Sequence, residues 1–219
     1  MRPTPFPLLL LIAACLASFG VAAQQPGLYR PAPVETTGSP DGPALDGPEL
    51  DGTLRLCPLD VATMAYDLRL GPVPGPEAPE ARGCVAFGLM EVTAAGLVAR
   101  GDGYHLVVEP AGDDAIVIGS VGSGGTLCTH AGLADGTWRR AGDCAVWRPL
   151  EIEQTQVMLR DLGLIGAVPM RRAADEGAAA DLARLLDGLA PGYAGAPAQA
   201  IATLVRLDWR RQCGGDGTC

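Results

Sequence analysis

The sequence predicts a single α+β domain, with a small antiparallel β-rich core braced by disulfides and two C-terminal amphipathic helices. Three observations predict this fold class. From about residue 53 to 164, short apolar runs alternate with glycine, proline and aspartate, a spacing typical of antiparallel sheets. The C-terminal third is rich in alanine and leucine at helical spacing. Six cysteines follow an apparent export signal, and an even number suits disulfides in an oxidising compartment.

Residues 1–23 have the features of a signal peptide. Arg2 precedes an apolar run from Leu8 to Ala17, and Val21-Ala22-Ala23 matches the small-x-small pattern of signal peptidase. We therefore expect cleavage before Gln24 and a periplasmic or secreted protein. No other segment approaches the roughly 18 continuous apolar residues of a membrane helix, so no membrane span is expected.

A lipid anchor is the alternative. Ile12-Ala13-Ala14-Cys15 resembles a lipoprotein cleavage box, in which Cys15 would be lipidated and retained at a membrane. Ordinary cleavage is favoured because Leu16–Ala23 would otherwise be an unusually apolar start for a mature lipoprotein.

Residues 24–52 are predicted to be a disordered, acidic tether. The segment has six prolines, few large apolar residues and a repeat in which Asp41-Gly42-Pro43 is followed by Asp46-Gly47-Pro48. It cannot bury enough apolar surface to offset the entropy of ordering. The folded domain is therefore expected to cover residues 53–219.

Several segments of this domain are predicted to be strands. Met64, Tyr66, Leu68 and Leu70 alternate with Ala65, Asp67 and Arg69, although Val61, Met64 and Leu68 also fit one helical face. The other expected strands are Cys84–Thr93, a hairpin of Leu97–Arg100 with Tyr104–Glu109, Ala115–Val121, Leu127–Thr129 and Cys144–Trp147.

Two amphipathic helices are predicted from about residue 175 onward. One apolar stripe consists of Leu182, Leu185, Leu186 and Leu189. The other, after Pro197, consists of Ile201, Leu204, Val205 and Trp209. Both stripes are expected to pack on the sheet.

The cysteines of the mature chain are expected to be structural. They are Cys57, Cys84, Cys128, Cys144, Cys213 and Cys219. Six cysteines allow many pairings, and pairing between sequence neighbours is the simplest: Cys57–Cys84, Cys128–Cys144 and Cys213–Cys219. No metal is expected, because no Cys-x-x-Cys pair occurs and the histidines are only two.

The composition excludes several classes of function. All 16 basic residues are arginine, so a Walker phosphate loop and Schiff-base catalysis, both of which need lysine, are excluded. A net charge of −9 argues against nucleic acid as a partner. No cofactor motif is found, so no cofactor is expected.

The candidate ligand-binding residues are His105, His130 and Trp147. A strand through Cys144–Trp147 places Trp147 outside beside Glu151 but turns Arg148 inward, where an unpaired charge is costly. A bulge at Arg148-Pro149 would place Trp147 in the core instead, and this arrangement is favoured.

We therefore expect an exported, non-catalytic envelope or secreted protein that binds an unidentified protein or small molecule through its disulfide-braced domain. The alternative is a small exported hydrolase. It would combine a histidine with Ser120 or Ser123 and with Asp113 or Asp114, or would use these two carboxylates as a pair.

Overall fold

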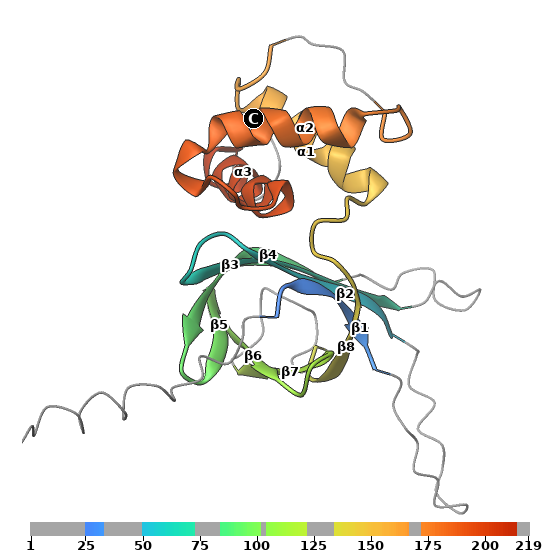
Figure 1. The fold of residues 1–219 in the computed structure, drawn as a ribbon, viewed down its shortest axis with the longest axis vertical. Coiled ribbons are helices and arrows are strands. Elements are labelled where there is room, and N and C mark those ends of the chain that lie inside the picture. The colour runs from blue at the N-terminus through green and yellow to red at the C-terminus, as the bar shows by residue number, and fades with distance from the viewer. Residues whose placement is uncertain are drawn as a thin grey trace, which may run out of the picture.

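The chain folds into a closed barrel of eight antiparallel strands with three α-helices on one side, as the computed structural model in Figure 1 shows. The structure describes residues 25–32, 50–72, 84–101, 104–121, 134–166 and 172–213. The strands follow one another around the barrel in chain order, and the last closes against the first. The expected fold class, a small sheet with two helices, is therefore wrong.

The elements have the following bounds. The strands are β1 (Gly27–Pro31), β2 (Leu50–Pro58), β3 (Thr63–Pro72), β4 (Cys84–Thr93), β5 (Gly96–Gly101), β6 (Tyr104–Pro110), β7 (Ala115–Val121) and β8 (Gly136–Gly142). The helices are α1 (Pro149–Asp161), α2 (Ala178–Leu189), the short 3₁₀ helix η1 (Pro191–Tyr193) and α3 (Ala198–Cys213).

Side chains fill the inside of the barrel. On β3, Met64, Tyr66 and Leu68 are buried in the interior, whereas Asp67 lies on the outer face that α3 covers. This is the two-residue alternation of a strand, and eight strands enclose a space that side chains can fill. The other interior residues are Tyr29, Leu54, Leu56, Leu70, Ala86, Met90, Leu97, Ala99, Leu106, Val108, Ile116, Ile118, Ala134 and Trp138.

Strand β1 corrects the predicted tether. Residues 27–31 lie within the segment expected to be disordered, yet they pair with β2 on one side and β8 on the other. Tyr29 has no exposed surface, and its hydroxyl donates to the Gln25 carbonyl oxygen at 2.8 Å. Burial of the Tyr29 ring stabilises this strand, although the proline-rich composition of the segment does not indicate it. Residues 33–49 lie outside the described residues.

Strand β8 contributes one residue to the barrel core. Trp138 is the only fully buried side chain of this strand, and its indole nitrogen donates to the Ala134 carbonyl oxygen at 2.9 Å. A strand with a single buried position shows no alternation in its sequence, which is why the pattern does not indicate it.

Other elements agree with the sequence. Segment 64–70, which the sequence left open between strand and helix, is part of a strand. β4 and β7 have the predicted bounds, and β5 and β6 form the predicted hairpin. Helices α2 and α3 contain the two predicted apolar stripes. The expectation that both helices pack on the sheet is wrong for α2, which packs on α3. The proposed strand Leu127–Thr129 lies outside the described residues.

The expected strand at Cys144–Trp147, with its bulge, is wrong. These residues form a turn and a short extended segment, and α1 begins at Pro149. Proline suits the first position of a helix because its missing N–H would have no intrahelical partner there. The Arg148 backbone N–H donates to the Glu151 carboxylate at 3.0 Å, which completes the helix start.

The helices form a layer over β2, β3 and β4 (Figure 1). α3 packs on these strands, and α1 and α2 pack on α3. Leu159, Leu182, Leu186 and Ile201 form the centre of a second apolar cluster among the helices. None of the described helices is long and apolar enough to cross a membrane.

Removing β1 should unfold the barrel. A chain that begins at Gln25 should unfold cooperatively in urea, whereas one that begins after Ala32 should lose cooperative unfolding, because β2 and β8 lose their partner and the core loses Tyr29. Urea unfolding followed by tryptophan fluorescence measures both. Equal cooperativity of the two chains would contradict the role assigned to β1.

Candidate functional site between the barrel and the helices

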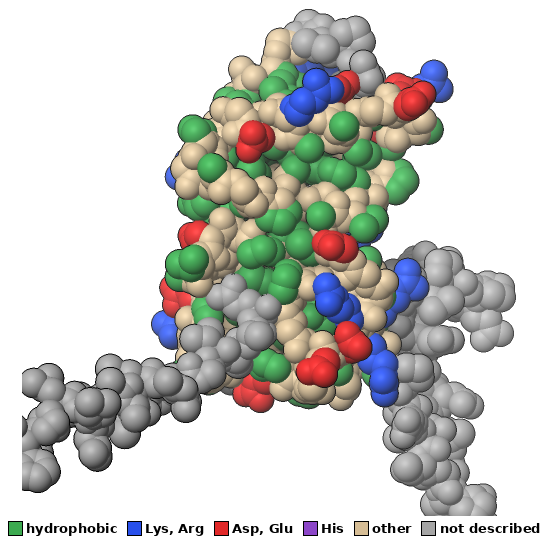
Figure 2. All heavy atoms as spheres, in the orientation of Figure 1, with side chains coloured by type: hydrophobic (Ala, Val, Ile, Leu, Met, Phe, Trp, Pro, Cys, Tyr) green, Lys and Arg blue, Asp and Glu red, His purple; other side chains and the backbone are tan. Residues whose placement is uncertain are grey.

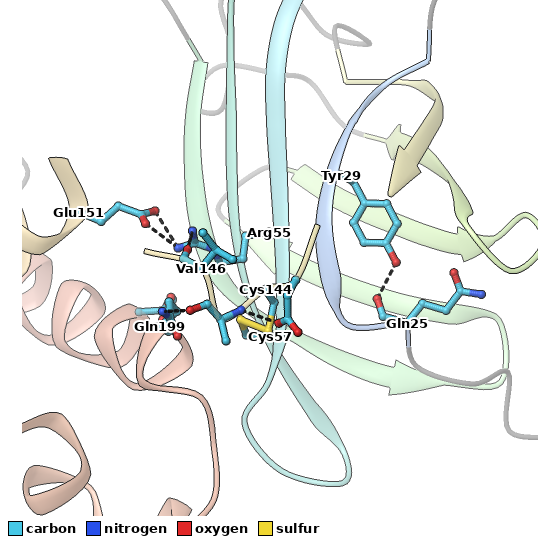
Figure 3. Close-up of a disulfide and its surroundings, with 11 residues drawn as sticks. Gln25, Tyr29, Arg55, Cys57, Cys144, Val146, Glu151 and Gln199 are labelled. Atoms are coloured by element: carbon cyan, nitrogen blue, oxygen red, sulfur yellow. Dashed lines mark hydrogen bonds and ion pairs between the residues drawn. A yellow bond between two sulfur atoms is a disulfide. The ribbon is translucent and has the colours of Figure 1, made fainter. Parts of the chain in front are cut away.

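A disulfide joins the barrel to the segment that leads into α1. Cys57, on the outer face of β2, is bonded to Cys144, and both residues are buried (Figure 3). This pairing corrects the expected Cys57–Cys84 and Cys128–Cys144 bonds. The expectation failed because the two cysteines that meet are 87 residues apart in sequence. A disulfide is compatible with a non-cytoplasmic location.

Cys213, the last residue of α3, is also disulfide-bonded. Its proposed partner, Cys219, lies outside the described residues, so the Cys213–Cys219 bond stays a prediction. Cys128 lies outside them as well.

Beside the Cys57–Cys144 bond, five charged residues form what we call the interface charge cluster: Arg55, Asp67, Arg148, Glu151 and Arg206. Arg55 of β2 donates to both carboxylate oxygens of Glu151 in α1 at 2.8 Å. Its other terminal nitrogen donates to the Val146 carbonyl oxygen at 2.7 Å (Figure 3). The pair therefore holds the start of α1 against the barrel.

Asp67 of β3 is the centre of the cluster. Its side chain is 2 % exposed, and it accepts hydrogen bonds from Arg148 at 2.6 Å and from Arg206 of α3 at 3.1 Å. Arg69, on the same face of β3, lies 3.3 Å from its other oxygen. One carboxylate thus connects the barrel to both α1 and α3.

Arg148 links the two carboxylates. It pairs with Asp67 and with Glu151, and it also donates to the Thr53 hydroxyl at 2.8 Å. An inward-facing Arg148 was expected to be an unpaired charge. In the structure it is paired, because Asp67 and Glu151 both lie within hydrogen-bond distance.

Burial and neighbouring charges shift the pKa values of three residues in the cluster. Burial alone would raise the pKa of Asp67, but Arg206, Arg69 and Arg148 outweigh it and hold the pKa below its ordinary value of 3.8. Burial lowers the pKa of Arg206, and Asp67 only partly compensates. Burial also acts to lower the pKa of Arg148, but Glu151 and Asp67 outweigh it and raise the pKa.

A small pocket lies within the cluster. Its volume is about 10 Å³, and its lining includes Arg55, Asp67, Glu151 and Arg206. Further lining residues are Trp147, Gln154, Thr155, Gln199, Ala202 and Thr203. The space suits a single water molecule.

A second feature adjoins the cluster on the outer face of β4. Phe87 is paired with Asp67 in the sheet, and the guanidinium groups of Arg206 and Arg210 lie over its ring at 4.1 and 3.9 Å from the centroid. Such contacts between arginine and an aromatic ring are attractive. Val85 and Leu89, on the same face, are 49 % and 38 % exposed.

The residues proposed for a hydrolase are not brought together. His105 is exposed on β6, and Ser120 of β7 is paired with Leu106, whose side chain lies inside the barrel. Paired residues share a face, so Ser120 and His105 are on opposite faces of the sheet. The Ser120 hydroxyl instead donates to Asp135 at 2.7 Å.

The remaining candidates are also separate. Asp113 and Asp114 are exposed in the turn between β6 and β7, at the end of β7 opposite Ser120. His130 and Ser123 lie outside the described residues. Trp147 is half-buried, packs against the helical apolar cluster and lines the pocket, so it belongs neither to the barrel core nor to an open surface. Among the described residues, no three His, Cys, Asp or Glu side chains are placed to hold a metal.

The sequence reasoning missed Arg55, Asp67 and Arg206 as site residues. On an alternating strand, Arg55 and Asp67 occupy outward positions, which a sequence pattern assigns to solvent. The sequence did contain one signal, Arg148-Pro149-Leu150-Glu151. A proline followed by an acidic residue predicts the start of a helix, where charged side chains are common.

Comparison with known protein families, curated proteins and solved structures finds no significant match. The function has to be argued from the described residues themselves.

Replacing Asp67 with asparagine should destabilise the fold by about 3–5 kcal/mol at neutral pH, because it leaves buried arginines without their shared carboxylate. Asp208→Asn is the control: its partner Arg211 is largely exposed, so its loss should cost less than about 1 kcal/mol. Urea unfolding measures both. Equal costs would contradict the central role of Asp67.

The same carboxylate should make stability depend on acid. Its pKa is lower in the folded than in the unfolded chain, so its contribution is complete above the unfolded value and is lost as pH falls through the folded value. The unaltered protein should therefore lose stability below about pH 4–5 more steeply than Asp67→Asn. Parallel curves would contradict the lowered pKa.

Breaking the disulfide should loosen α1. The double substitution Cys57→Ala and Cys144→Ala should cost about 2–5 kcal/mol, since it removes a restraint on a long loop of the unfolded chain. Hydrogen exchange should accelerate most in α1, with the β6–β7 hairpin as the internal reference. Unchanged protection of α1 relative to that hairpin would show that the bond does not hold the helix in place.

Proposed function

We propose that this chain is an exported, non-catalytic protein that binds a partner protein on the outside of its disulfide-braced barrel. The observation that carries the proposal is the filled interior. Tyr29, Tyr66 and Trp138, with the smaller apolar residues around them, occupy the space in which open barrels hold their ligands. A ligand inside would have to displace this core, so recognition is assigned to the outer surface.

The placement of the polar residues supports the non-catalytic half of the proposal. His105 and Ser120 lie on opposite faces of the β6–β7 sheet, and Asp113 and Asp114 lie at the far end of β7. A general base must lie within hydrogen-bond reach of the group it activates. These residues do not meet that condition in the described structure.

We assign recognition to a surface on β4 that consists of Val85, Phe87, Leu89 and Arg210, and call it the β4 surface. The three apolar residues alternate along the outer face of the strand, and Arg210 of α3 lies over the Phe87 ring. Interfaces are enriched in aromatic residues and arginine, and hot spots favour arginine. Figure 2 shows apolar side chains gathered where the helices meet the barrel.

The chemistry of this surface indicates the kind of partner. Arg210 is exposed, and the neighbouring Arg206 is positively charged and nearly buried. An apolar protein surface with acidic residues at its rim would match both the exposed leucine and valine and the arginine. The proposed partner is therefore a protein with an apolar, acidic contact surface.

Photocrosslinking in the cells that make the protein tests this proposal. A photoreactive amino acid in place of Leu89 should yield a discrete adduct with a second protein, and Arg210→Glu should reduce its yield because the charge reverses. The control position is Val117, which has the same exposure as Leu89, 39 % against 38 %, but lies on β7.

The outcome decides between specific and nonspecific contact. An adduct at position 89 that is missing at position 117 supports recognition by the β4 surface. Equal adducts at both positions, or none at either, would overturn the assignment of this surface.

A further inference from the structure

Among the described strands, one edge of β4 has no neighbour over most of its length. β4 pairs with β3 from Cys84 to Glu91, whereas its pairing with β5 is confined to its last three residues, Glu91–Thr93. β5 ends at Gly101, which would lie opposite Gly88 if the pairing continued in the same register. β5 is therefore too short to cover the first part of β4.

The backbone groups on this edge belong to the residues whose side chains form the β4 surface. Successive residues of a strand direct their N–H and C=O groups to opposite edges. The Val92 N–H donates to the Ala62 carbonyl oxygen just before β3 at 2.9 Å, so the even-numbered residues of β4 face β3. The N–H and C=O groups of Val85, Phe87 and Leu89 consequently point to the other edge, where no described strand pairs with them.

This edge also lacks the features by which proteins usually prevent strand pairing. Native edges are protected by charged side chains, by proline or by bulges. From Val85 to Met90, β4 has neither a charged residue nor a proline, and its register with β3 is unbroken. Such an edge is a template for another strand, which would bind through main-chain hydrogen bonds and through alternate side chains.

We propose that the partner of the β4 surface contributes an extended segment, which adds as a strand to the edge of β4 at Val85–Leu89. The inference rests on the function proposed above and specifies how the partner is recognised. Arg210 lies over the Phe87 ring at the middle of this edge. The segment should therefore carry an acidic residue there, between apolar residues that contact Val85 and Leu89.

Hydrogen exchange of the free protein tests whether the edge is open. By NMR, the amides of Val85, Phe87 and Leu89 should exchange rapidly, whereas those of the even-numbered residues between them should exchange slowly because they are bonded to β3. Uniformly slow exchange would show that another part of the chain covers the edge and would overturn the proposal.

A proline distinguishes strand addition from contact by side chains alone. Proline has no N–H and is tolerated in a strand where the N–H faces away from the ladder. Val85→Pro removes a donor from the edge, whereas Val85→Ala also shortens the apolar side chain but keeps that donor. With the photoreactive amino acid at position 89, Val85→Pro should give about fivefold less adduct than Val85→Ala, because a carbonyl of the partner loses its donor.

The outcomes separate this proposal from the function on which it rests. No adduct at position 89 in the otherwise unaltered chain would overturn the β4 surface itself. An adduct that both substitutions weaken equally would keep that surface but overturn strand addition.

Urea unfolding checks that both variants fold. If Val85→Pro does not fold, hydrogen exchange of the purified adduct decides instead. Amide exchange at Val85 and Phe87 should be slower in the adduct than in the free protein, and unchanged exchange there would overturn strand addition.

Discussion

The arrangement of this protein depends on one buried carboxylate. Asp67 lies on the outer face of β3, and the arginines that pair with it come from its own strand, from the start of α1 and from α3. Taking charges out of water costs several kcal/mol per ion, so the cluster adds less to net stability than the apolar contacts around it. The cluster instead favours one position of the helices on the barrel, because another position would leave Asp67 buried without its arginines. The Cys57–Cys144 bond restrains the same contact covalently.

The barrel and the helices have different roles in the fold. The barrel buries its own apolar core and presents β2, β3 and β4 as a platform for α3. On that platform, Asp67 and Phe87 are paired neighbours in the sheet, and Arg206 contacts both. The same helix residue therefore connects the buried cluster with the apolar surface of β4. Arg206 of the cluster thus contacts Phe87 of the β4 surface directly.

Several elements were predictable because their residues follow a simple period. β3 alternates between apolar and polar residues from Tyr66 to Leu70, and the leucine stripe of α2 has the spacing of a helix. β1, β8 and α1 were not predictable in this way. β1 lies in a proline-rich segment, β8 buries only Trp138, and α1 buries Glu151 beside Ile152, which disturbs an apolar stripe. Each of these elements is stable because of partners far away in sequence.

The sequence by itself indicated β4 to β7 and the last two helices, because local periodicity sets the face that each can bury. It left β3 open between strand and helix, and it did not indicate β2. It did not indicate the partners of Arg148, because the favoured bulge at Arg148-Pro149 was meant to avoid an inward-facing arginine. Only the tertiary structure decided that the sheet closes, that Cys57 meets Cys144 and that Asp67 and Glu151 are the partners of Arg148. Closure needs β1 and β8 to pair although they lie near opposite ends of the barrel sequence. An outward charged residue on a strand has the same sequence pattern whether water or a helix covers it. The physical reason is that burial of the outer face depends on long-range contacts, which a local pattern does not contain.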